Sequence, residues 1–269
     1  VSKTIHALGG NSLATGFLGG KAGEMIEGVL KKYGIQTDFI YVDGETRTNT
    51  KVVEALGEVT ELNEPGPVVT KEQVEGLLEK LEGYAGADTL VVLAGSIPKG
   101  VDQTIYQEIT ERVHKKGGKV LMDADGELFI QGLKARPDMI KPNRAELEAY
   151  YHLDYRASEN ELVSMGKRLL ANGSSLAAIS LGQMGALFLS EGKAVRCPGL
   201  SVKAHSTVGA GDAMVAALAY SWDQKLSFEE TIRLGMAASA GAVTTIGTKP
   251  PARELVDQLA KQVTTETVL

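Results

Sequence analysis

The chain has 269 residues, a single cysteine at Cys197 and a formal net charge of −6 with acidic and basic residues interspersed. A chain of this length buries roughly three quarters of the surface that its unfolded form exposes, and one cysteine excludes an internal disulfide and indicates a reducing compartment. The charge argues against a broad nucleic-acid-binding face, and no stretch reads as a membrane span or a signal peptide, so we expect a soluble cytoplasmic protein.

The first third of the chain predicts short elements around a hairpin. Residues 1–8 place Val1, Ile5 and Leu8 on one face of a helix that Gly9-Gly10 ends. Because a compact domain seldom begins in mid-helix, we expect that residues are missing upstream. The next predicted elements are a strand at 12–18, a helix at 22–33, a strand at 38–42, and a hairpin of 48–55 with 58–62 that reads as a flap.

Beyond Pro65-Gly66-Pro67 helices and strands alternate regularly. Helices are predicted from Lys71, Gln103, Arg144, Glu159, Ser227 and Ala252, and strands at 88–94, 119–122, 139–140 and 176–180, the last followed by a hairpin through Val195. Continuously apolar strands such as 89–94 are typical of a parallel sheet that is covered on both faces. The alternation predicts a doubly wound α/β sheet with helices on both faces.

Glycine-rich or polar turns follow the expected strands. They cover residues 94–100, 123–126, 141–143, 180–185 and 209–212. Ligands of doubly wound sheets bind beyond the carboxyl ends of the strands. Any one of these turns can be only a turn, but five at one edge of a sheet predict a ligand site.

The strongest candidate is the turn Gly209-Ala210-Gly211-Asp212, which precedes an apolar run to Tyr220. Glycine allows a ligand to approach the backbone closely, and the first amides of a helix lack intrahelical acceptors and lie at the positive end of the helix dipole. The turn therefore predicts an anion site. Asp212 either caps the helix or acts on the ligand, and the pattern alone supports both interpretations.

The two commonest phosphate-binding motifs are absent. The dinucleotide-binding pattern G-x-G-x-x-G is broken because Met214 occupies the position of its third glycine. A P-loop pattern around Gly20-Lys21 is also broken, because Thr15 occupies the position of its first glycine and Ala22 that of its Ser or Thr. The turn at 209–212 must therefore hold the phosphates if any element does.

Asn143 and Glu146 share a helix face and could reach Mg²⁺ directly or through water, although the start of a helix explains the spacing equally well. No cluster in the sequence suggests zinc, and the four histidines are scattered: His6, His114, His152 and His205. We interpret His205, near the glycine turn, as structural.

The chain resembles the ribokinase-like (PfkB-type) carbohydrate kinases, and within them the branch of 1-phosphofructokinase and tagatose-6-phosphate kinase. Thr-Val-Gly-Ala-Gly-Asp-Ala-Met-Val at 207–215 is similar to the highly specific C-terminal signature of that family. Further motifs match in order and spacing, at 46–51, 57–63, 95–98, 141–147 and 179–182. The resemblance spans essentially the whole chain. Family members begin with a further strand, lid elements, a sugar-binding aspartate and a Gly-Gly-Lys-Gly-x-Asn motif, which would precede Val1.

The resemblance implies a single ribokinase-like α/β domain over residues 1–269, with 36–65 as an inserted β lid that excludes water and pairs two subunits in a homodimer. It also implies transfer of the ATP γ-phosphate to a hydroxyl of a ketohexose phosphate, most simply fructose 1-phosphate, with Mg²⁺. Asp212 would be the general base, and the amides of Gly209, Ala210 and Gly211 would hold the charge of the transferred group. Asn143 and Glu146 would organise the Mg²⁺.

The resemblance assigns two further sets of ligands. Residues that would line the nucleotide are Ser180, Gly182 and Gly185, with Ser239 and Gly241 near the adenine. Residues that would face the phosphosugar are Arg47, Asn49, Lys51, Ser96 and Lys99. For Arg47 and Lys99 the alternative interpretation is a solvated surface charge.

Three alternatives remain at this stage. Tagatose-6-phosphate kinase or 6-phosphofructokinase activity would use the same motifs. A non-catalytic nucleotide- or sugar-binding module would bind ligand without releasing ADP. A dinucleotide-dependent oxidoreductase is disfavoured by the failed G-x-G-x-x-G pattern.

Overall fold

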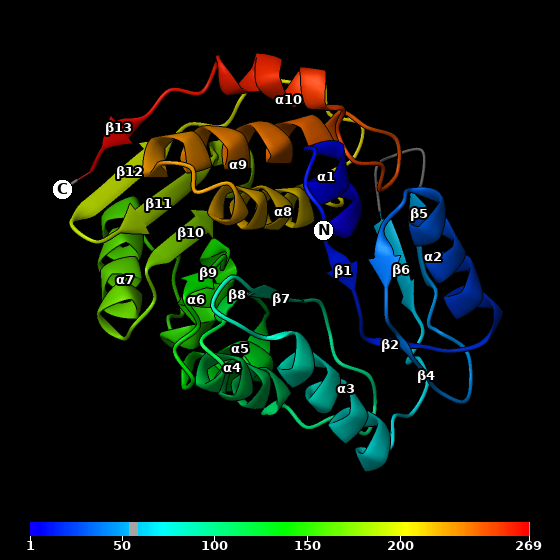
Figure 1. The fold of residues 1–269 in the computed structure, drawn as a ribbon. Coiled ribbons are helices and arrows are strands. Elements are labelled where there is room, and N and C mark those ends of the chain that lie inside the picture. Colours follow the sequence, from blue (N-terminus) through cyan, green and yellow to red (C-terminus); the bar gives the residue numbers. More distant parts are fainter. Residues whose placement is uncertain (54–58, 269) are drawn as a thin grey trace. The chain divides into compact units, whose positions relative to one another are not determined.

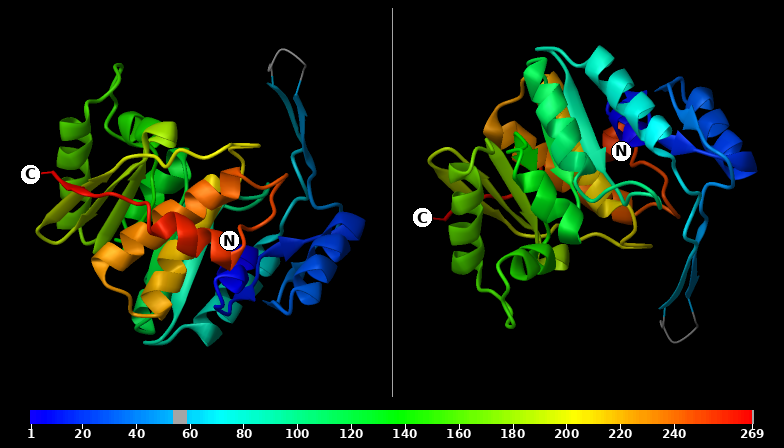
Figure 2. Two further views of the ribbon diagram at one scale, coloured as in Figure 1. Left: turned by 90° about the horizontal axis from the view of Figure 1, so that it is seen from above. Right: turned by 90° about the horizontal axis from the view of Figure 1, so that it is seen from below.

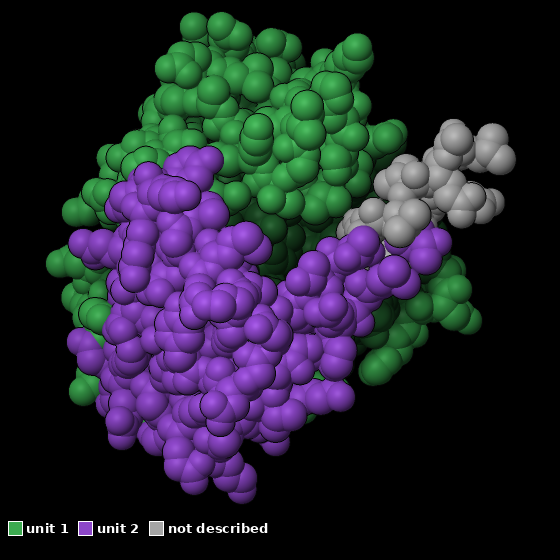
Figure 3. Space-filling model, turned by 90° about the vertical axis from the view of Figure 1, so that its right-hand side faces the viewer, with its two compact units in different colours: residues 1–11, 84–95, 103–269 green, residues 12–83, 96–102 purple. Residues whose placement is uncertain are grey.

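The computed structural model describes residues 1–53 and 59–268, without the side chains of residues 51–53, 59 and 61. The chain divides into two compact units, which Figure 3 colours separately. Unit 1 comprises Val1–Asn11, Tyr84–Gly95 and Gln103–Leu269, and unit 2 comprises Ser12–Gly83 and Ser96–Asp102. None of the helices in the described residues combines the length and apolar character that crossing a bilayer requires.

Unit 1 is built on a seven-stranded sheet in the order β13-β12-β11-β10-β9-β8-β7. The strands are β7 (Leu90–Ala94), β8 (Lys119–Asp123), β9 (Met139–Ile140), β10 (Leu176–Ser180), β11 (Ala186–Ser190), β12 (Lys193–Cys197) and β13 (Glu266–Thr267). Strands β7 to β10 are parallel, whereas β10 to β13 pair antiparallel. The expected α/β class is confirmed, with a sheet that is mixed because a hairpin and the C-terminal strand extend its parallel half.

Helices cover both faces of this sheet (Figure 1; Figure 2 gives two further views). One face carries α1 (Ser2–Ala7), α8 (Ala210–Asp223), α9 (Phe228–Val243) and α10 (Arg253–Ala260), and the other carries α4 (Ile105–Lys115), α5 (Gly126–Leu133), α6 (Arg144–Tyr150) and α7 (Glu159–Ala171). Helix α8 lies against β7, β8 and α9, so most of its length is buried. Its apolar run therefore reflects contact on several sides, and Met214 and Leu218 join Phe188 of β11 in the main core.

Several helices of unit 1 begin at signals that are visible in the sequence. Capping boxes start α6 at Asn143, α7 at Ser158 and α9 at Ser227, and in each a Glu at the third helical position returns a hydrogen bond to the cap. These local bonds fix where the helices start, and they explain why those starts were predicted within a residue.

Unit 2 contains α2 (Gly20–Lys32), α3 (Lys71–Tyr84) and three two-stranded sheets. Strand β1 (Leu13–Ala14) pairs with β3 (Gln36–Thr37), β2 (Phe17–Leu18) pairs with β4 (Ile40–Tyr41), and β5 (Asn49–Val53) pairs antiparallel with β6 (Val59–Asn63). The β5–β6 hairpin projects from the rest of unit 2 (Figure 2). Its expected strands agree with the prediction outside residues 54–58, which lie beyond the described part of the chain.

Several local predictions differ from the structure. The strand expected at 38–42 is present only as β4, and β3 before it was not predicted. The strand expected at 12–18 is split into β1 and β2, since Gly16 between them has φ 138°, which ends an extended run. Helix α5 and strand β13 were not predicted. Helix α5 follows directly on the turn at 123–126, and β13 is two exposed residues held only by pairing with β12.

Candidate active site

The first turn of α8 carries Asp212 on its exposed side. The N-cap of this helix is Gly209, in the left-handed conformation at φ 86°, and no side chain caps it. Asp212 is the third helical residue, so it does not cap the helix. The capping interpretation, which the sequence left open, is therefore excluded, and the carboxylate remains available to a ligand.

Backbone amides at this helix start are open to an anion. Within the described residues the amides of Gly209, Gly211 and Asp212 have no hydrogen-bond acceptor. Of the three amides predicted to bind phosphate, only that of Ala210 is engaged, by a long 3.4 Å bond to the Thr207 carbonyl. No atom lies within 4 Å of a Cβ placed on Gly209, so a ligand can reach the backbone there. The helix start has the free donors and the space that an anion site needs.

A buried ion pair lies beside this turn, and sequence reasoning assigned it no role. Lys141 follows β9 and is 5% exposed, and its Nζ lies 2.9 Å from Oδ1 of Asp123 at the end of β8. A Cβ placed on Gly211 would lie 3.6 Å from that Nζ, which puts the ammonium next to the free amides. Burial raises the pKa of Asp123, Lys141 opposes this, and the charge of Asp212 adds to the rise. The signal that pointed to the pair was the position of both residues at the carboxyl ends of neighbouring strands.

Asn143 and Glu146 form the capping box of α6. The Asn143 side chain accepts from the Glu146 amide at 2.9 Å, and Glu146 Oε2 accepts from the Asn143 amide at 2.8 Å. Burial raises the pKa of Glu146, the Asn143 amide and Lys141 oppose this, and the charges of Asp123 and Asp125 add to the rise. Burial is therefore the main reason that the charged form of this carboxyl is disfavoured.

The side-chain oxygens of Asn143 and Glu146 fit Mg²⁺, because that ion is usually held by one or two carboxylates together with water and substrate phosphates. In the described part of the chain no three His, Cys, Asp or Glu side chains form a metal-binding group, so any such ion would need oxygens from the substrate and from water. The side-chain oxygens of Asn143 and Glu146 would supply the chain's share of such a set, with the charge of Asp123 nearby.

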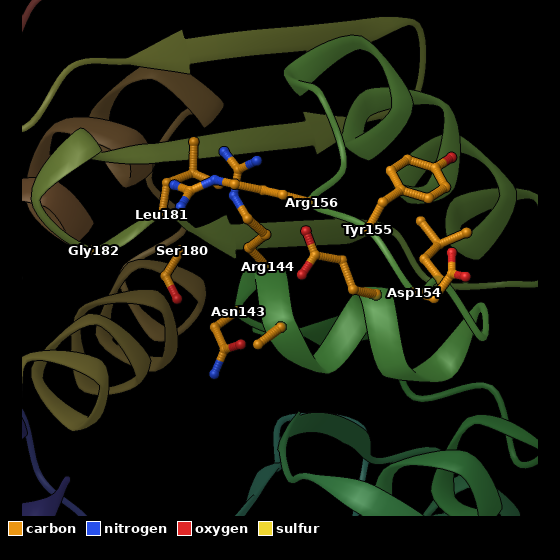
Figure 4. A pocket seen from close by; sticks show the side chains of 11 residues that line it. Asn143, Arg144, Asp154, Tyr155, Arg156, Ser180, Leu181 and Gly182 are labelled. Atoms are coloured by element: carbon orange, nitrogen blue, oxygen red, sulfur yellow. The ribbon is translucent and has the colours of Figure 1, made fainter.

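Ser180 and Asn143 lie next to each other, since the backbone of Asn143 forms a parallel β-bridge with Ser180. Figure 4 shows both side chains at one side of a cavity of about 620 Å³, whose other side carries Asp154 and Tyr155. Gly182 also lines the cavity; it has φ 63° and no atom within 4 Å of a placed Cβ. Ser180 and Gly182 thus offer open contacts at the sheet edge where a nucleotide was predicted.

Two other glycines predicted to contact the nucleotide have packing roles. A Cβ on Gly185 would lie 2.0 Å from the Cys197 carbonyl oxygen, and a Cβ on Gly241 would lie 2.8 Å from Cβ of Pro251. Close approach of neighbouring chain segments therefore already accounts for glycine at both positions. Ser239 is half-buried on α9, and its contact with a nucleotide stays a prediction.

The residues predicted to bind the phosphosugar all belong to unit 2, whereas those described above belong to unit 1. Within unit 2, Nη2 of Arg47 donates to Oγ of Ser96 at 2.6 Å, which brings two predicted ligands together across 49 residues of sequence. Lys99 and Asn49 are exposed, and the side chain of Lys51 lies outside the described part of the structure. Arg47 and Ser96 therefore present a paired cation and hydroxyl of the kind that binds phosphate.

Free amides, a buried ammonium and an exposed carboxylate at one helix start are the groups that phosphoryl transfer needs, because such groups can stabilise migrating negative charge and accept a proton. Residues 1–255 match the family model described as pfkB family carbohydrate kinase. The chain belongs to this family.

Relatives and solved structures agree with that assignment. The chain is 33% identical over 264 residues to the 1-phosphofructokinase of Haemophilus influenzae, which covers 98% of this chain and 84% of the relative. It is 35% identical over 240 residues to that of Borreliella burgdorferi, covering 88% and 76%. The structure of phosphofructokinase-2 from Escherichia coli with substrates and products matches with a TM-score of 0.91 at 26% identity, over 97% of this chain and 85% of the other. The predicted ribokinase-like kinase fold is confirmed.

Proposed function

We propose that the protein phosphorylates fructose 1-phosphate with ATP to give fructose 1,6-bisphosphate. The observation that carries the proposal is the exposed Asp212 in the first turn of α8, beside amides that have no acceptor. The choice of sugar rests on the relatives, which include 1-phosphofructokinases at 31–35% identity.

In the proposed reaction the chain supplies a base and positive charge. Asp212 accepts the proton of the sugar hydroxyl as the hydroxyl oxygen bonds to the γ-phosphorus of ATP, and the bond from that phosphorus to the oxygen bridging to the β-phosphate breaks, so that ADP leaves. The free amides of Gly209 and Gly211, with the ammonium of Lys141, stabilise the negative charge on the transferred group. Since phosphoryl transfer requires little covalent chemistry from the protein, alignment and charge supply most of the rate.

The remaining predicted residues bind the two substrates. Ser180 and Gly182 contact the nucleotide, and Asn143 and Glu146 hold Mg²⁺ through oxygen ligands and water. When bound, Mg²⁺ neutralises phosphate charge and orients the triphosphate. The phosphosugar ligands are Arg47 and Ser96, together with Asn49, Lys51 and Lys99.

A second sugar specificity has a specific observation behind it. Phosphofructokinase-2 from Escherichia coli, solved in complex with fructose-6-phosphate, matches this chain with a TM-score of 0.88 at 25% identity. Measuring ADP release with fructose 1-phosphate, fructose 6-phosphate and tagatose 6-phosphate distinguishes the candidates by kcat/KM. A higher kcat/KM for either 6-phosphate than for fructose 1-phosphate would replace the proposed substrate.

We further propose that the protein is cytoplasmic and forms a homodimer in which the β5–β6 hairpin acts as a lid. The buried thiol of Cys197, without a disulfide partner, supports a reducing compartment. The projecting hairpin with its exposed Leu62 supports a pairing surface.

Replacement of Asp212 by Asn tests the chemistry. The amide keeps the shape of the side chain but cannot accept the hydroxyl proton, so we expect kcat to fall by roughly 10²- to 10⁴-fold. Steady-state kinetics and thermal melting of Asp212→Asn are compared with those of Asp223→Asn, a matched control at the other end of α8. Near-normal turnover of the Asp212 variant, or equal losses in both variants, would refute the base assignment.

A further inference from the structure

A second cavity lies among helices α5, α6 and α7 of unit 1, and no residue of the candidate active site lines it. Its volume is about 310 Å³, within the range of small-ligand sites. Ile130, Leu133, Tyr150 and Leu169 form an apolar lining from three helices, and Lys134 and Arg136 add two cations. No acidic side chain is among the lining residues.

This cavity is at the opposite edge of the sheet from the proposed catalytic groups. Arg136 precedes β9 by three residues and Ser174 precedes β10 by two, so both lie at the amino ends of parallel strands. Lys141 and Ser180, at the carboxyl ends of the same strands, lie at the active-site edge. A ligand in this cavity would therefore not occupy the predicted nucleotide site of unit 1.

The backbone is shaped to place the Arg136 side chain at the cavity. Arg136 has φ 57°, a left-handed conformation that glycine adopts freely and that is unfavourable for other residues. The following helix–strand turn makes room for it at Gly173, where a Cβ would lie 3.1 Å from both Cβ and Cδ of Arg136. The backbone conformation at residue 136 thus favours glycine, yet the residue there is arginine. The aliphatic part of its side chain packs against Gly173, where a larger residue would collide with it.

Arg136 and Lys134 are both exposed to solvent at the mouth of the cavity, and neither forms an ion pair within the described residues. Among those residues the Arg136 guanidinium also makes no hydrogen bond, whereas the Lys134 ammonium donates to Oε1 of Gln131. Two cations without a carboxylate between them lower the energy of a bound anion, and a guanidinium binds phosphate or carboxylate oxygens in pairs. The apolar lining gives such a ligand a second, uncharged contact surface.

We propose that this cavity is a binding site for a small amphiphilic anion, which places a phosphate or carboxylate group between Lys134 and Arg136 and an apolar body against Ile130, Leu133 and Tyr150. The site is separate from the proposed kinase chemistry, and it requires both the charge and the apolar part of the ligand.

Phenyl phosphate is a suitable probe, because it joins a dianion to a ring. Isothermal titration of the intact protein, in the presence of saturating ADP, is expected to detect phenyl phosphate binding. Inorganic phosphate and phenol, each carrying half of the ligand, should bind at least tenfold more weakly. Displacement of the probe by ADP, or equal binding of inorganic phosphate and phenyl phosphate, would overturn the proposal.

Variants locate the probe. Lys134→Ala with Arg136→Gly removes both cations, and glycine suits the left-handed backbone at 136, so the fold should be kept or stabilised. Since charge-assisted hydrogen bonds contribute about 1.5–3 kcal/mol each, we expect the double variant to bind at least tenfold more weakly. Arg136→Lys should retain most of the binding, and Lys167→Ala, an exposed cation of α7 outside the cavity, should retain all of it. Unchanged affinity in the folded double variant would refute the site.

Discussion

Asp123, at the carboxyl end of β8, and Asp138, just before the amino end of the neighbouring strand β9, show how local partners decide the state of a carboxyl. Burial raises the pKa of Asp123, since the opposing effect of Lys141 does not outweigh burial together with the charges of Asp212 and Asp125. Burial also acts on Asp138, but hydrogen bonds from Lys119, the Val120 amide and His114 outweigh it and lower the pKa. Asp138 is thus a stabilising anchor before β9, whereas Asp123 belongs to a charged cluster suited to ligands.

Asp138→Asn should destabilise the protein at neutral pH. A carboxyl with a lowered pKa in the folded state contributes stability above its unfolded pKa, near 3.8, and loses it as pH falls through the folded value. We expect a loss of about 1 kcal/mol at pH 7, since the group is partly solvated, and thus a Tm lower by about 2–4 °C. Urea denaturation at pH 7, 4 and 3 should show this difference shrinking toward pH 3. A difference that is constant with pH would contradict the electrostatic explanation.

Glu146→Gln separates the structural role of this residue from its proposed role at Mg²⁺. Glutamine still completes a capping box, so the fold should be unaffected. Loss of the carboxylate should raise the Mg²⁺ concentration for half-maximal activity by on the order of 10-fold. Glu161→Gln and Glu230→Gln change the equivalent residue in the capping boxes of α7 and α9, and they should leave the Mg²⁺ titration unaltered. An unchanged titration in Glu146→Gln would end the metal assignment.

At the scale of elements, the turn between β10 and β11 contains two glycines that have different structural roles. Gly182 and Gly185 frame the short 3₁₀ helix there, and both have positive φ. Gly182 has open space at its Cβ position, whereas Gly185 is pressed against the backbone of residues 197–199. The same turn therefore carries one glycine open to a ligand and one required for packing.

Gly185→Ala should be severely destabilising, because the new methyl would meet the Cys197 carbonyl oxygen at 2.0 Å and φ is 99°. Gly192→Ala, at φ 69° with no atom within 4 Å, carries only the backbone cost of about 1 kcal/mol. Expression level and thermal melting should rank Gly185→Ala far below Gly192→Ala. Equal stability of the two variants would show that the segment 197–199 yields to the methyl group.

At the scale of the whole molecule, the chemistry is divided between two compact units. Unit 1 holds the proposed base, the free amides and the nucleotide contacts, and unit 2 holds the predicted phosphosugar ligands and the β5–β6 hairpin. The proposed reaction would require both sets of residues for turnover, whereas nucleotide binding would require only the set in unit 1. Substitutions of the predicted phosphosugar ligands in unit 2 should therefore change the dependence of the rate on sugar concentration.

Leu62→Glu tests the proposed pairing through the hairpin. Leu62 on β6 is 57% exposed, and a charge there would oppose burial against a second subunit. Size-exclusion chromatography with light scattering should show the wild-type protein as a dimer and the variant shifted toward monomer. Ile246→Glu, at a 75% exposed position in unit 1, is the control and should remain dimeric. A monomeric wild type, or a dimer unaffected by Leu62→Glu, would reject the hairpin interface.

Local features of this protein could be read from its sequence. The helix starts at Asn143, Ser158 and Ser227 depend on bonds between residues three apart, and the turn at 209–212 depends on its own glycines. The parallel strands were recognisable because they are continuously apolar. The split at Gly16 and the pairing of β13 were not, since short exposed strands depend on a partner distant in sequence.

The sequence by itself therefore determined the α/β class, the kinase signature and the position of its carboxylate, because each is encoded in neighbouring residues. Only the tertiary structure decided that Asp212 leaves the cap to Gly209, that Lys141 pairs with Asp123 beside the free amides, and that Gly185 serves packing. Those outcomes depend on contacts between segments far apart in the chain, and no local pattern specifies such distances.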